Sequence, residues 1–196
     1  MTAAAKTLAI MPAWNEAAVI GDTVRELLST VEGVDLLVVD DGSSDETAAA
    51  ARDAGAAVMV LPFNLGVGGA LRAGFKYAWE NGYDRAIQVD ADGQHEPSQI
   101  EAVLAGLDQA DISIGARFSG VGDYAVRGPR RWAMSLLAAV FSRVARTRLT
   151  DITSGFRAAN RRAILQYTRH YPAEYLGDTV DSLMTALRAG LTVVQV

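Results

Sequence analysis

Two aspartates separated by one residue end an apolar run, in the stretch IQVDADGQH at residues 87–95. In an extended segment, residues i and i+2 point to the same side, so the carboxylates of Asp90 and Asp92 can converge on one cation. Oxygen ligands suit Mg²⁺ or Mn²⁺, and Gln94 offers a further oxygen or a contact that supports the ligands. The alternative for such a pair is a solvated acidic turn. The spacing therefore indicates a divalent metal site, with phosphate oxygens at its open positions.

A second acidic pair, Asp40 and Asp41, follows the apolar run LLVV. A carboxylate at the end of a strand can accept hydrogen bonds from a nucleobase or a ribose hydroxyl. The stretch DGSSD also has the composition of a turn followed by a helix cap, with Asp45 as the capping residue. Asp41 and Asp45 can divide these two tasks, so both interpretations remain open.

The stretch NLGVGGALRAG, residues 64–74, is rich in glycine. It lacks the third glycine and the ribose-binding acid of a dinucleotide fingerprint, and it has no P-loop lysine. We interpret these glycines as permitting close approach of the backbone to a ligand. Plain turn formation is the alternative.

The net charge of −5 conceals a basic segment. Residues 117–162 contain ten arginines and only two acids, a net charge of +8 that leaves −13 for the rest of the chain. This asymmetry favours an anionic partner, namely phosphate, nucleic acid or a membrane surface. Arg117, together with Arg131 and Ser135, can converge on a phosphate. Nucleic acid is disfavoured, because the arginines lack interleaved aromatic residues for base stacking.

The apolar bulk and flanking arginines of residues 130–148 suit a helix that lies on anionic lipid, although a core helix with solvated arginines fits the same pattern. No segment has about 18 uncharged apolar residues in a row, so we expect no spanning helix. The N-terminus does not resemble a signal peptide, and the absence of cysteine excludes disulfides and thiol catalysis. These features favour a cytoplasmic protein.

Strand-like runs alternate with helical patterns along the chain, which predicts one α/β domain over residues 1–196 with a mostly parallel sheet flanked by helices. The predicted strands are Thr7–Ala13, Asp35–Asp40, Ala57–Leu61, Arg85–Val89, Ile112–Ala116 and Leu191–Val196. The predicted helices are Ala17–Ser29, Asp45–Ala54, Gly69–Asn81, Ser98–Leu107, Arg130–Arg148 and Thr179–Ala189, with a helical excursion around residues 120–175. In open sheets of this class, ligands bind beyond the carboxyl ends of the strands. The polar clusters after the first four strands fall at that edge.

Taken together, these clusters resemble the family 2 glycosyltransferases, which have the GT-A fold, and within them the polyprenyl-phosphate (dolichol-phosphate) mannosyltransferase branch. The matching stretches are PAWNE, VVDDGSSDET, NLGVGGALRAGF, VDADGQHEP, GARF and DITSGFRAANR. They lie between Pro12 and Arg161 in the family's order. Trp14 replaces the more usual tyrosine. Relatives continue past Val196, so we expect this chain to lack a C-terminal segment of the family.

The resemblance implies a role for each matching position. The nucleotide contacts it implies are Pro12, Trp14, Glu16, Val39 and Asp41. The metal and diphosphate site would comprise Asp90, Ala91, Asp92 and Gln94. Arg117, Arg131 and Ser135 would bind the acceptor phosphate, and Asp151, Ser154 and Arg157 would line the sugar and acceptor pocket.

The function so implied is an inverting, metal-dependent hexosyltransferase. It would move a sugar from a nucleotide-diphosphate sugar to a polyprenyl phosphate at the inner face of the cytoplasmic membrane, and a membrane-protein partner is compatible with that role. A polyprenyl phosphate needs no general base, because it is largely a dianion at neutral pH. A hydroxyl acceptor in polysaccharide or glycolipid synthesis would need one, with Asp178 as first candidate and Asp181 as second. A nucleotidyltransferase and a non-catalytic nucleotide- or lipid-binding module are two competing classes.

Overall fold

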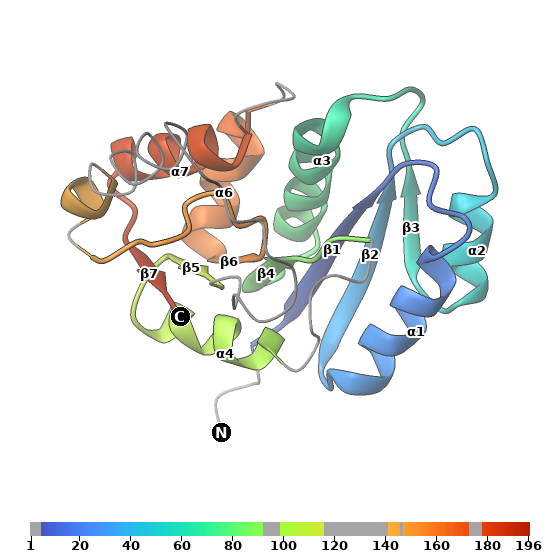
Figure 1. The fold of residues 1–196 in the computed structure, drawn as a ribbon, viewed down its shortest axis with the longest axis horizontal. Coiled ribbons are helices and arrows are strands. Elements are labelled where there is room, and N and C mark those ends of the chain that lie inside the picture. Colours follow the sequence, from blue (N-terminus) through green and yellow to red (C-terminus); the bar gives the residue numbers. More distant parts are fainter. Residues whose placement is uncertain (1–4, 92–98, 116–140, 146, 173–177) are drawn as a thin grey trace, which may run out of the picture.

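The computed structural model describes residues 5–91, 99–115, 141–145, 147–172 and 178–196. Within these ranges the chain forms one seven-stranded sheet with the order β3-β2-β1-β4-β6-β5-β7, which runs from β3 to β7 across Figure 1. The strands are β1 (Thr7–Ala13), β2 (Val34–Asp40), β3 (Ala57–Val60), β4 (Arg85–Gln88), β5 (Ile112–Ile114), β6 (Arg157–Asn160) and β7 (Val193–Gln195). All pair in parallel except β6, which is antiparallel to both β4 and β5. The predicted α/β class with a mostly parallel sheet is therefore confirmed.

Helices cover both faces of the sheet. One face packs against α1 (Ile20–Thr30), α2 (Thr47–Asp53) and α4 (Ile100–Ala105), and the other packs against α3 (Gly66–Glu80), α6 (Arg161–His170) and α7 (Asp178–Arg188). A short 3₁₀ helix, η2 (Gly106–Asp108), follows α4. Among the described residues, no helix has the length and apolarity needed to cross a membrane.

Strand alternation explains the two apolar layers. In β1, Leu8 and Ile10 belong to the core on the α3 side, whereas Ala9 and Met11 belong to the core on the α1 side. Successive side chains of a strand point to opposite faces, so the central strands β1 and β2, which lie between two helical layers, are apolar except near their ends. The polar residues that follow these strands gather at the carboxyl edge, where the candidate site lies.

The predicted elements agree with the structure where the pattern is strongly apolar. The predicted strand Thr7–Ala13 matches β1 in both bounds, and the other five predicted strands match to within a few residues. The helix α3 begins at Gly66, three residues before the predicted start. The sequence pattern missed β6 and α6, which were included in the helical excursion. Most of the predicted helix 130–148 lies outside the described residues, although residues 141–145 are helical.

One buried carboxylate joins the elements that the sequence pattern did not separate. Asp111, which is 8 % exposed, accepts hydrogen bonds from the Thr192 backbone N–H at 2.8 Å and from Asn160 Nδ2 at 3.0 Å. Arg162 lies at 3.2 Å from the same carboxylate. Burial opposes its ionisation, but the hydrogen bonds from Thr192 and Asn160 and the charge of Arg162 outweigh burial, so the pKa of Asp111 is lowered. Asp111 thereby fastens β5 to β6, α6 and the segment before β7.

We expect Asp111→Asn to destabilise the fold by about 1–3 kcal/mol at pH 7, because a charged acceptor with several donors is replaced by a neutral one. The folded-state pKa lies below the unfolded value of roughly 3.9, so the wild-type advantage is present above that pH. It is lost as the pH falls through the folded-state pKa. Urea unfolding of both proteins, at pH 7 and in steps below pH 4, measures this difference.

Asp108→Asn is the matched control, because the Asp108 side chain is 68 % exposed and makes a surface ion pair with Arg85 at 3.0 Å. Exposed pairs of this kind contribute about 0–1 kcal/mol. Equal unfolding midpoints of Asp111→Asn and wild type at pH 7 would contradict the role given to Asp111.

Candidate nucleotide and acceptor site

A pocket of about 260 Å³ lies at the carboxyl edge of the sheet, where β1, β2 and the start of α3 meet. Its lining residues are Pro12, Ala13, Trp14, Asp41, Asn64, Gly66, Val67 and Ala70. The pocket lies on the α3 side of the sheet. Ile10 and Val39 belong to the core on that side, and residues two positions further along a strand, here Pro12 and Asp41, point to the same face. Trp14 is 50 % exposed, so one face of a large aromatic ring is open to a planar ligand.

Asp41 is buried to 3 % exposure at the base of this pocket. One of its carboxylate oxygens accepts a hydrogen bond from the Leu65 backbone N–H at 2.8 Å, and its own N–H donates to the carbonyl of Ala13 at 2.8 Å. Burial raises the pKa of Asp41, and hydrogen bonds from the backbone of Leu65 and Gly66 partly offset that rise. The carboxylate is thus a pre-oriented acceptor in a desolvated place.

The loops after β1 and β2 are also tied to each other. Asn15 has a positive φ of 56°, and its side-chain oxygen accepts from the Ser44 backbone N–H at 2.9 Å. Asp45 accepts from the Thr47 backbone N–H at 3.0 Å and from the Ala17 backbone N–H at 3.2 Å. Hydrogen bonds from Thr47 and Ala17 lower the pKa of Asp45, the side-chain bond from Thr47 being the largest effect. Asp41 thus lines the pocket, and Asp45 ties the loop before α2, but the predicted cap is not Asp45, because Glu46 stands at the N-cap of α2.

Close backbone packing holds the loop after β3 against the loop after β2. Gly42 has a φ of +70°, and a Cβ added to it would lie 2.8 Å from the backbone carbon of Phe63. The loop after β2 therefore touches the loop after β3 through its backbone. Gly74 has a different role from the one predicted for these glycines, because a Cβ there would collide with Ile10 of β1. Only Gly66, with a φ of +78°, both starts α3 and lines the pocket.

Two of the expected nucleotide contacts do not line this pocket. Val39 is 0 % exposed and forms part of the core, so the structure does not bring it to a ligand. The backbone N–H of Glu16 donates to Thr47 Oγ1 at 2.8 Å, and its carbonyl accepts from Ile20 at 2.9 Å at the start of α1. Of the residues expected to bind the nucleotide, the structure brings together Pro12, Trp14 and Asp41.

Asp90 directly follows Val89 at the end of the fourth strand, and its neighbours Val89 and Ala91 both pack into the α1-side core. Ala91 is 6 % exposed, and its carbonyl accepts from Thr23 Oγ1 of α1 at 3.2 Å. A Cβ added to Gly155 would lie 3.6 Å from both carboxylate oxygens of Asp90. The DITSGFR stretch, far along the chain, therefore lies against the first aspartate of the DAD motif.

The second half of the predicted metal site falls outside the described residues, since Asp92 and Gln94 lie within 92–98. Among the residues that the structure does describe, no cluster of three or more acidic or histidine side chains is able to hold a metal. The Asp90 carboxylate supplies oxygen atoms, the type of ligand that Mg²⁺ and Mn²⁺ prefer. Gly155, the neighbouring residue of the DITSGFR loop, has no side chain to stand against that carboxylate.

Arg157 is bound by the protein itself. It is 6 % exposed, and its guanidinium donates to the carbonyls of Ser154 at 2.7 Å, Ile152 at 2.6 Å and Thr179 at 2.6 Å. A further hydrogen bond reaches Ser182 Oγ at 3.3 Å. A buried guanidinium needs its donors satisfied, and here main-chain carbonyls satisfy most of them. Arg157 therefore fastens the DITSGFR loop to the first turn of α7.

The remaining acceptor-side residues occupy different surroundings. Ser154 is 0 % exposed, and its hydroxyl accepts from the Phe156 backbone N–H at 3.3 Å. Asp151 is partly exposed and accepts from the backbone N–H of Thr153 at 3.0 Å and from its hydroxyl at 2.9 Å. Asp178 begins α7, next to the Thr179 carbonyl that Arg157 holds. Arg117, Arg131 and Ser135 fall within 116–140, outside the described residues.

The sequence reasoning did not single out Asn15, Asn64 or Gly155. Asn15 and Asn64 lie in the loops after β1 and β3, and asparagine is common in left-handed and turn conformations, so their types and positions carried a usable signal. Gly155 carried no such signal, because its closeness to Asp90 depends on the antiparallel return of β6 beside β4.

Comparison with known proteins adds several relatives and solved structures. The chain is 36 % identical over 159 residues to an undecaprenyl-phosphate mannosyltransferase of Micrococcus luteus, covering 78 % of this chain and 65 % of that protein. It is 33 % identical over 201 residues to a polyprenol monophosphomannose synthase of Mycolicibacterium smegmatis, covering 97 % of this chain and 76 % of that protein. The chain thus spans about two thirds to three quarters of the length of these relatives.

Among solved structures, glucosyl-3-phosphoglycerate synthase from Mycobacterium tuberculosis superposes with a TM-score of 0.75 at 25 % identity, over 98 % of this chain and 70 % of that one. That protein was crystallised with Mn²⁺, UDP-glucose and phosphoglyceric acid. The likeness confirms the predicted GT-A fold.

The family model for glycosyl transferase family 2 matches residues 8–168, which include the pocket at the carboxyl edge, Asp90 and the DITSGFR loop. The predicted family and the predicted branch of relatives are both confirmed. The chain belongs to glycosyl transferase family 2.

Proposed function

We propose that this protein transfers a sugar from a nucleotide-diphosphate sugar to a polyprenyl phosphate. The observation that carries the proposal is the convergence of Pro12, Trp14 and Asp41 from two strand ends on one pocket at the carboxyl edge. Two relatives whose names specify polyprenyl-phosphate or polyprenol mannosyl transfer, both more than 30 % identical, support the acceptor class.

The donor's base would lie in the pocket against the exposed ring of Trp14. Asp41 would accept a hydrogen bond from a base N–H, which both uracil and guanine can donate. Because the Asp41 carboxylate already accepts from Leu65, the ligand meets an acceptor whose orientation is fixed before binding. The diphosphate would extend along the sheet edge toward Asp90.

Asp90, Asp92 and Gln94 would hold Mg²⁺ or Mn²⁺, since all three supply oxygen donors. When bound, such an ion neutralises negative charge that develops on the departing nucleoside diphosphate. The contact between the Thr23 hydroxyl and the Ala91 carbonyl fixes the strand end that carries these side chains. Gly155 brings the DITSGFR loop against Asp90 without a side chain between them.

The acceptor phosphate would be positioned by Arg117 and Arg131, with Ser135 as an additional donor. Its second pKa is about 6, so at pH 7 it is mostly a dianion and attacks without a general base. Its oxygen forms a bond to the anomeric carbon while the bond from that carbon to the donor's phosphate oxygen breaks. The nucleoside diphosphate leaves, and the anomeric centre is inverted.

A lipid acceptor places the reaction at a membrane surface, so we propose a peripheral protein at the inner face of the cytoplasmic membrane. A hydroxyl acceptor is the second candidate. It is favoured by one observation, the anchoring of the Thr179 carbonyl beside Asp178 by Arg157, which would hold a base in a fixed place.

We expect nucleoside diphosphates of one base to raise the thermal unfolding midpoint only when Mn²⁺ is present. A ligand at about 100 times its dissociation constant adds roughly 2.7 kcal/mol, which corresponds to a shift of about 5–10 °C for a chain of this size. Asp92→Ala should remove the part of this midpoint shift that depends on Mn²⁺. Asp41→Asn should weaken nucleotide binding about 10-fold to 100-fold, because a charged acceptor is lost.

The control for Asp41→Asn is Asp53→Asn, the same change at an exposed position at the end of α2. Nucleotide binding without any transfer to a polyprenyl phosphate would favour the non-catalytic module over the enzyme. An identical nucleotide response in wild type, Asp41→Asn and Asp53→Asn would reject this pocket as the donor site.

Gly155→Ala should lower the affinity for Mn²⁺ about 10-fold, as expected for a residue that supports a metal ligand. The added methyl group would lie 3.0 Å from Gln88 Nε2, so the Gln88 amide must shift, and it would set an apolar group 3.6 Å from the Asp90 carboxylate. The readout is a Mn²⁺ titration of the nucleotide-dependent midpoint. Gly21→Ala on α1 is the control, since a Cβ there meets the Arg25 guanidinium at 3.4 Å. Unchanged Mn²⁺ affinity in Gly155→Ala would show that the DITSGFR loop does not support the metal site.

Asp178→Asn separates the two acceptor classes. With a polyprenyl phosphate acceptor, we expect kcat to change less than about 3-fold, because no base is needed; loss of a general base typically costs about 100-fold to 10,000-fold. The comparison variant is Asp181→Asn, which removes the same charge from an exposed position on α7. A loss of 100-fold or more in Asp178→Asn alone would favour the hydroxyl acceptor.

A further inference from the structure

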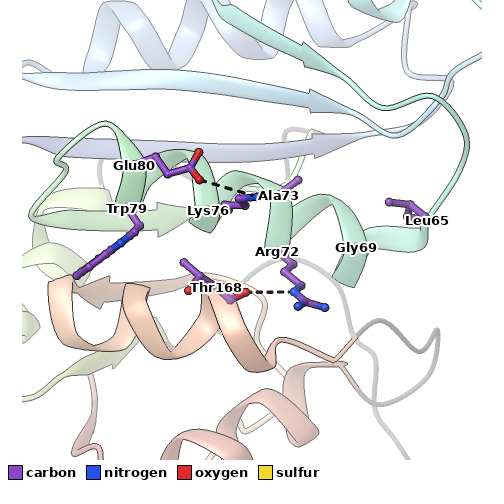
Figure 2. Close-up of a pocket in the computed structure, with 8 residues that line it drawn as sticks. All are labelled: Leu65, Gly69, Arg72, Ala73, Lys76, Trp79, Glu80 and Thr168. Carbon is purple, nitrogen blue, oxygen red and sulfur yellow. Dashed lines mark hydrogen bonds and ion pairs between the residues drawn. The ribbon is translucent and has the colours of Figure 1, made fainter.

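A groove of about 590 Å³ lies between α3 and α6, outside the donor pocket (Figure 2). Its lining residues are Leu65, Gly69, Arg72, Ala73, Lys76, Trp79, Glu80 and Thr168. The α3 members recur at intervals of three or four residues, so they form one stripe along that helix. The proposed sugar transfer makes no use of this groove.

Two cations of α3 are available in the groove. Arg72 Nε donates to the Thr168 carbonyl of α6 at 3.2 Å, which directs the guanidinium into the groove, as Figure 2 shows. Among the described residues, Arg72 forms no ion pair with an acid. Lys76 lies 3.9 Å from Glu80, but both side chains are exposed, and such a pair contributes little. The groove thus offers cationic groups to an external anion.

The surroundings of the groove are also basic. The helix α6 contains three arginines and no acid, and α3 adds Arg72 and Lys76 against Glu80, giving a combined charge of +4 in a chain of −5. Arg161 lies over the ring of Trp79 at 4.2 Å, at one end of the groove. Arg162 is partly neutralised by Asp111 at 3.2 Å. The surface formed by α3 and α6 therefore complements an anionic surface.

Exposed apolar side chains lie at the other end of the groove. Leu65 lines it, Phe63 lies two residues earlier in the connection between β3 and α3, and Val67 lies in the first turn of α3. The side chains of Leu65, Phe63 and Val67 are 41 %, 62 % and 38 % exposed, respectively. Apolar side chains beside lysine and arginine are the arrangement by which peripheral proteins bind anionic membranes: the cations meet lipid phosphates and the apolar groups enter the acyl boundary.

We propose that the α3–α6 groove and the apolar connection before it form a docking surface for an anionic phospholipid membrane. Lipid phosphates would bind at Arg72 and Lys76, and Phe63 and Leu65 would reach the acyl boundary. This inference rests on the proposed function, which brings a lipid acceptor to the enzyme. Leu65 also donates its N–H to Asp41 of the donor pocket, so docking would hold that pocket at a defined height above the membrane.

The test is co-sedimentation with vesicles of phosphatidylglycerol and phosphatidylcholine, without any acceptor lipid. Each basic residue near an anionic surface contributes about 1 kcal/mol, so the double variant Arg72→Ala/Lys76→Ala should bind anionic vesicles about 30-fold more weakly. Wild-type binding should fall as salt is added. The matched control is Arg25→Ala/Arg52→Ala, which removes two exposed arginines from the opposite helical layer and should bind as wild type does.

Phe63→Ser tests the apolar part separately, because it should weaken the binding that persists at high salt without removing a charge. Equal vesicle binding by wild type and by the Arg72→Ala/Lys76→Ala variant would overturn the docking surface. The docking surface would also be overturned if the Arg25→Ala/Arg52→Ala variant lost vesicle binding to the same extent, because attraction to the vesicles would then depend on net charge alone.

Two further measurements separate this inference from the proposed function. The thermal midpoint of the double variant, with and without nucleotide and Mn²⁺, shows that the fold and the donor pocket are intact. Transfer to a short-chain polyprenyl phosphate in detergent reports the reaction without a membrane. Retained transfer in detergent with lost vesicle binding supports the docking surface. Groove-dependent vesicle binding in a wild-type protein that transfers no sugar supports the docking surface and refutes the proposed function.

Discussion

The hydrogen bond from the Leu65 backbone N–H to the Asp41 carboxylate, 2.8 Å long, fixes the geometry on which the donor side depends. The same residue, Asp41, donates its N–H to Ala13, so three successive strand ends are joined through one buried residue. Asp41 is only 3 % exposed, so this hydrogen bond lies in a medium of low dielectric. A hydrogen bond to a carboxylate is strong in such a medium, and a buried carboxylate without a donor would destabilise the fold. That bond holds the start of α3, the helix that lines both the pocket and the α3–α6 groove.

Arg157 is the corresponding anchor on the acceptor side. Three main-chain carbonyls, from Ile152, Ser154 and Thr179, accept from its guanidinium. A guanidinium can be buried only when nearly all its donors are satisfied, so the loop and the start of α7 must keep the spacing that this fork demands. The loop in turn places Gly155 against Asp90, which connects the acceptor side of the site to the predicted metal site.

The sheet also separates two differently charged helical layers. On one side, α6 is wholly basic among its charged residues, and its arginines flank a groove that carries Arg72 and Lys76. On the other side, α1 contains Asp22 and Glu26 against the single cation Arg25. The α3–α6 side is thus the more cationic of the two, which is the charge that the proposed docking to an anionic membrane requires.

The sequence by itself determined the apolar strands, their parallel arrangement and the polar carboxyl edge, because the central strands β1 and β2 are buried on both faces and carry their polar residues near their ends. That constraint sufficed to bring Pro12, Trp14 and Asp41 together. Only the tertiary structure showed that Arg157 binds carbonyls of its own chain, that β6 returns antiparallel, and that Thr168 closes a groove with Arg72. The reason is that a local pattern fixes the face on which a side chain lies, whereas its partner, when distant in sequence, is chosen by the packing of the whole chain.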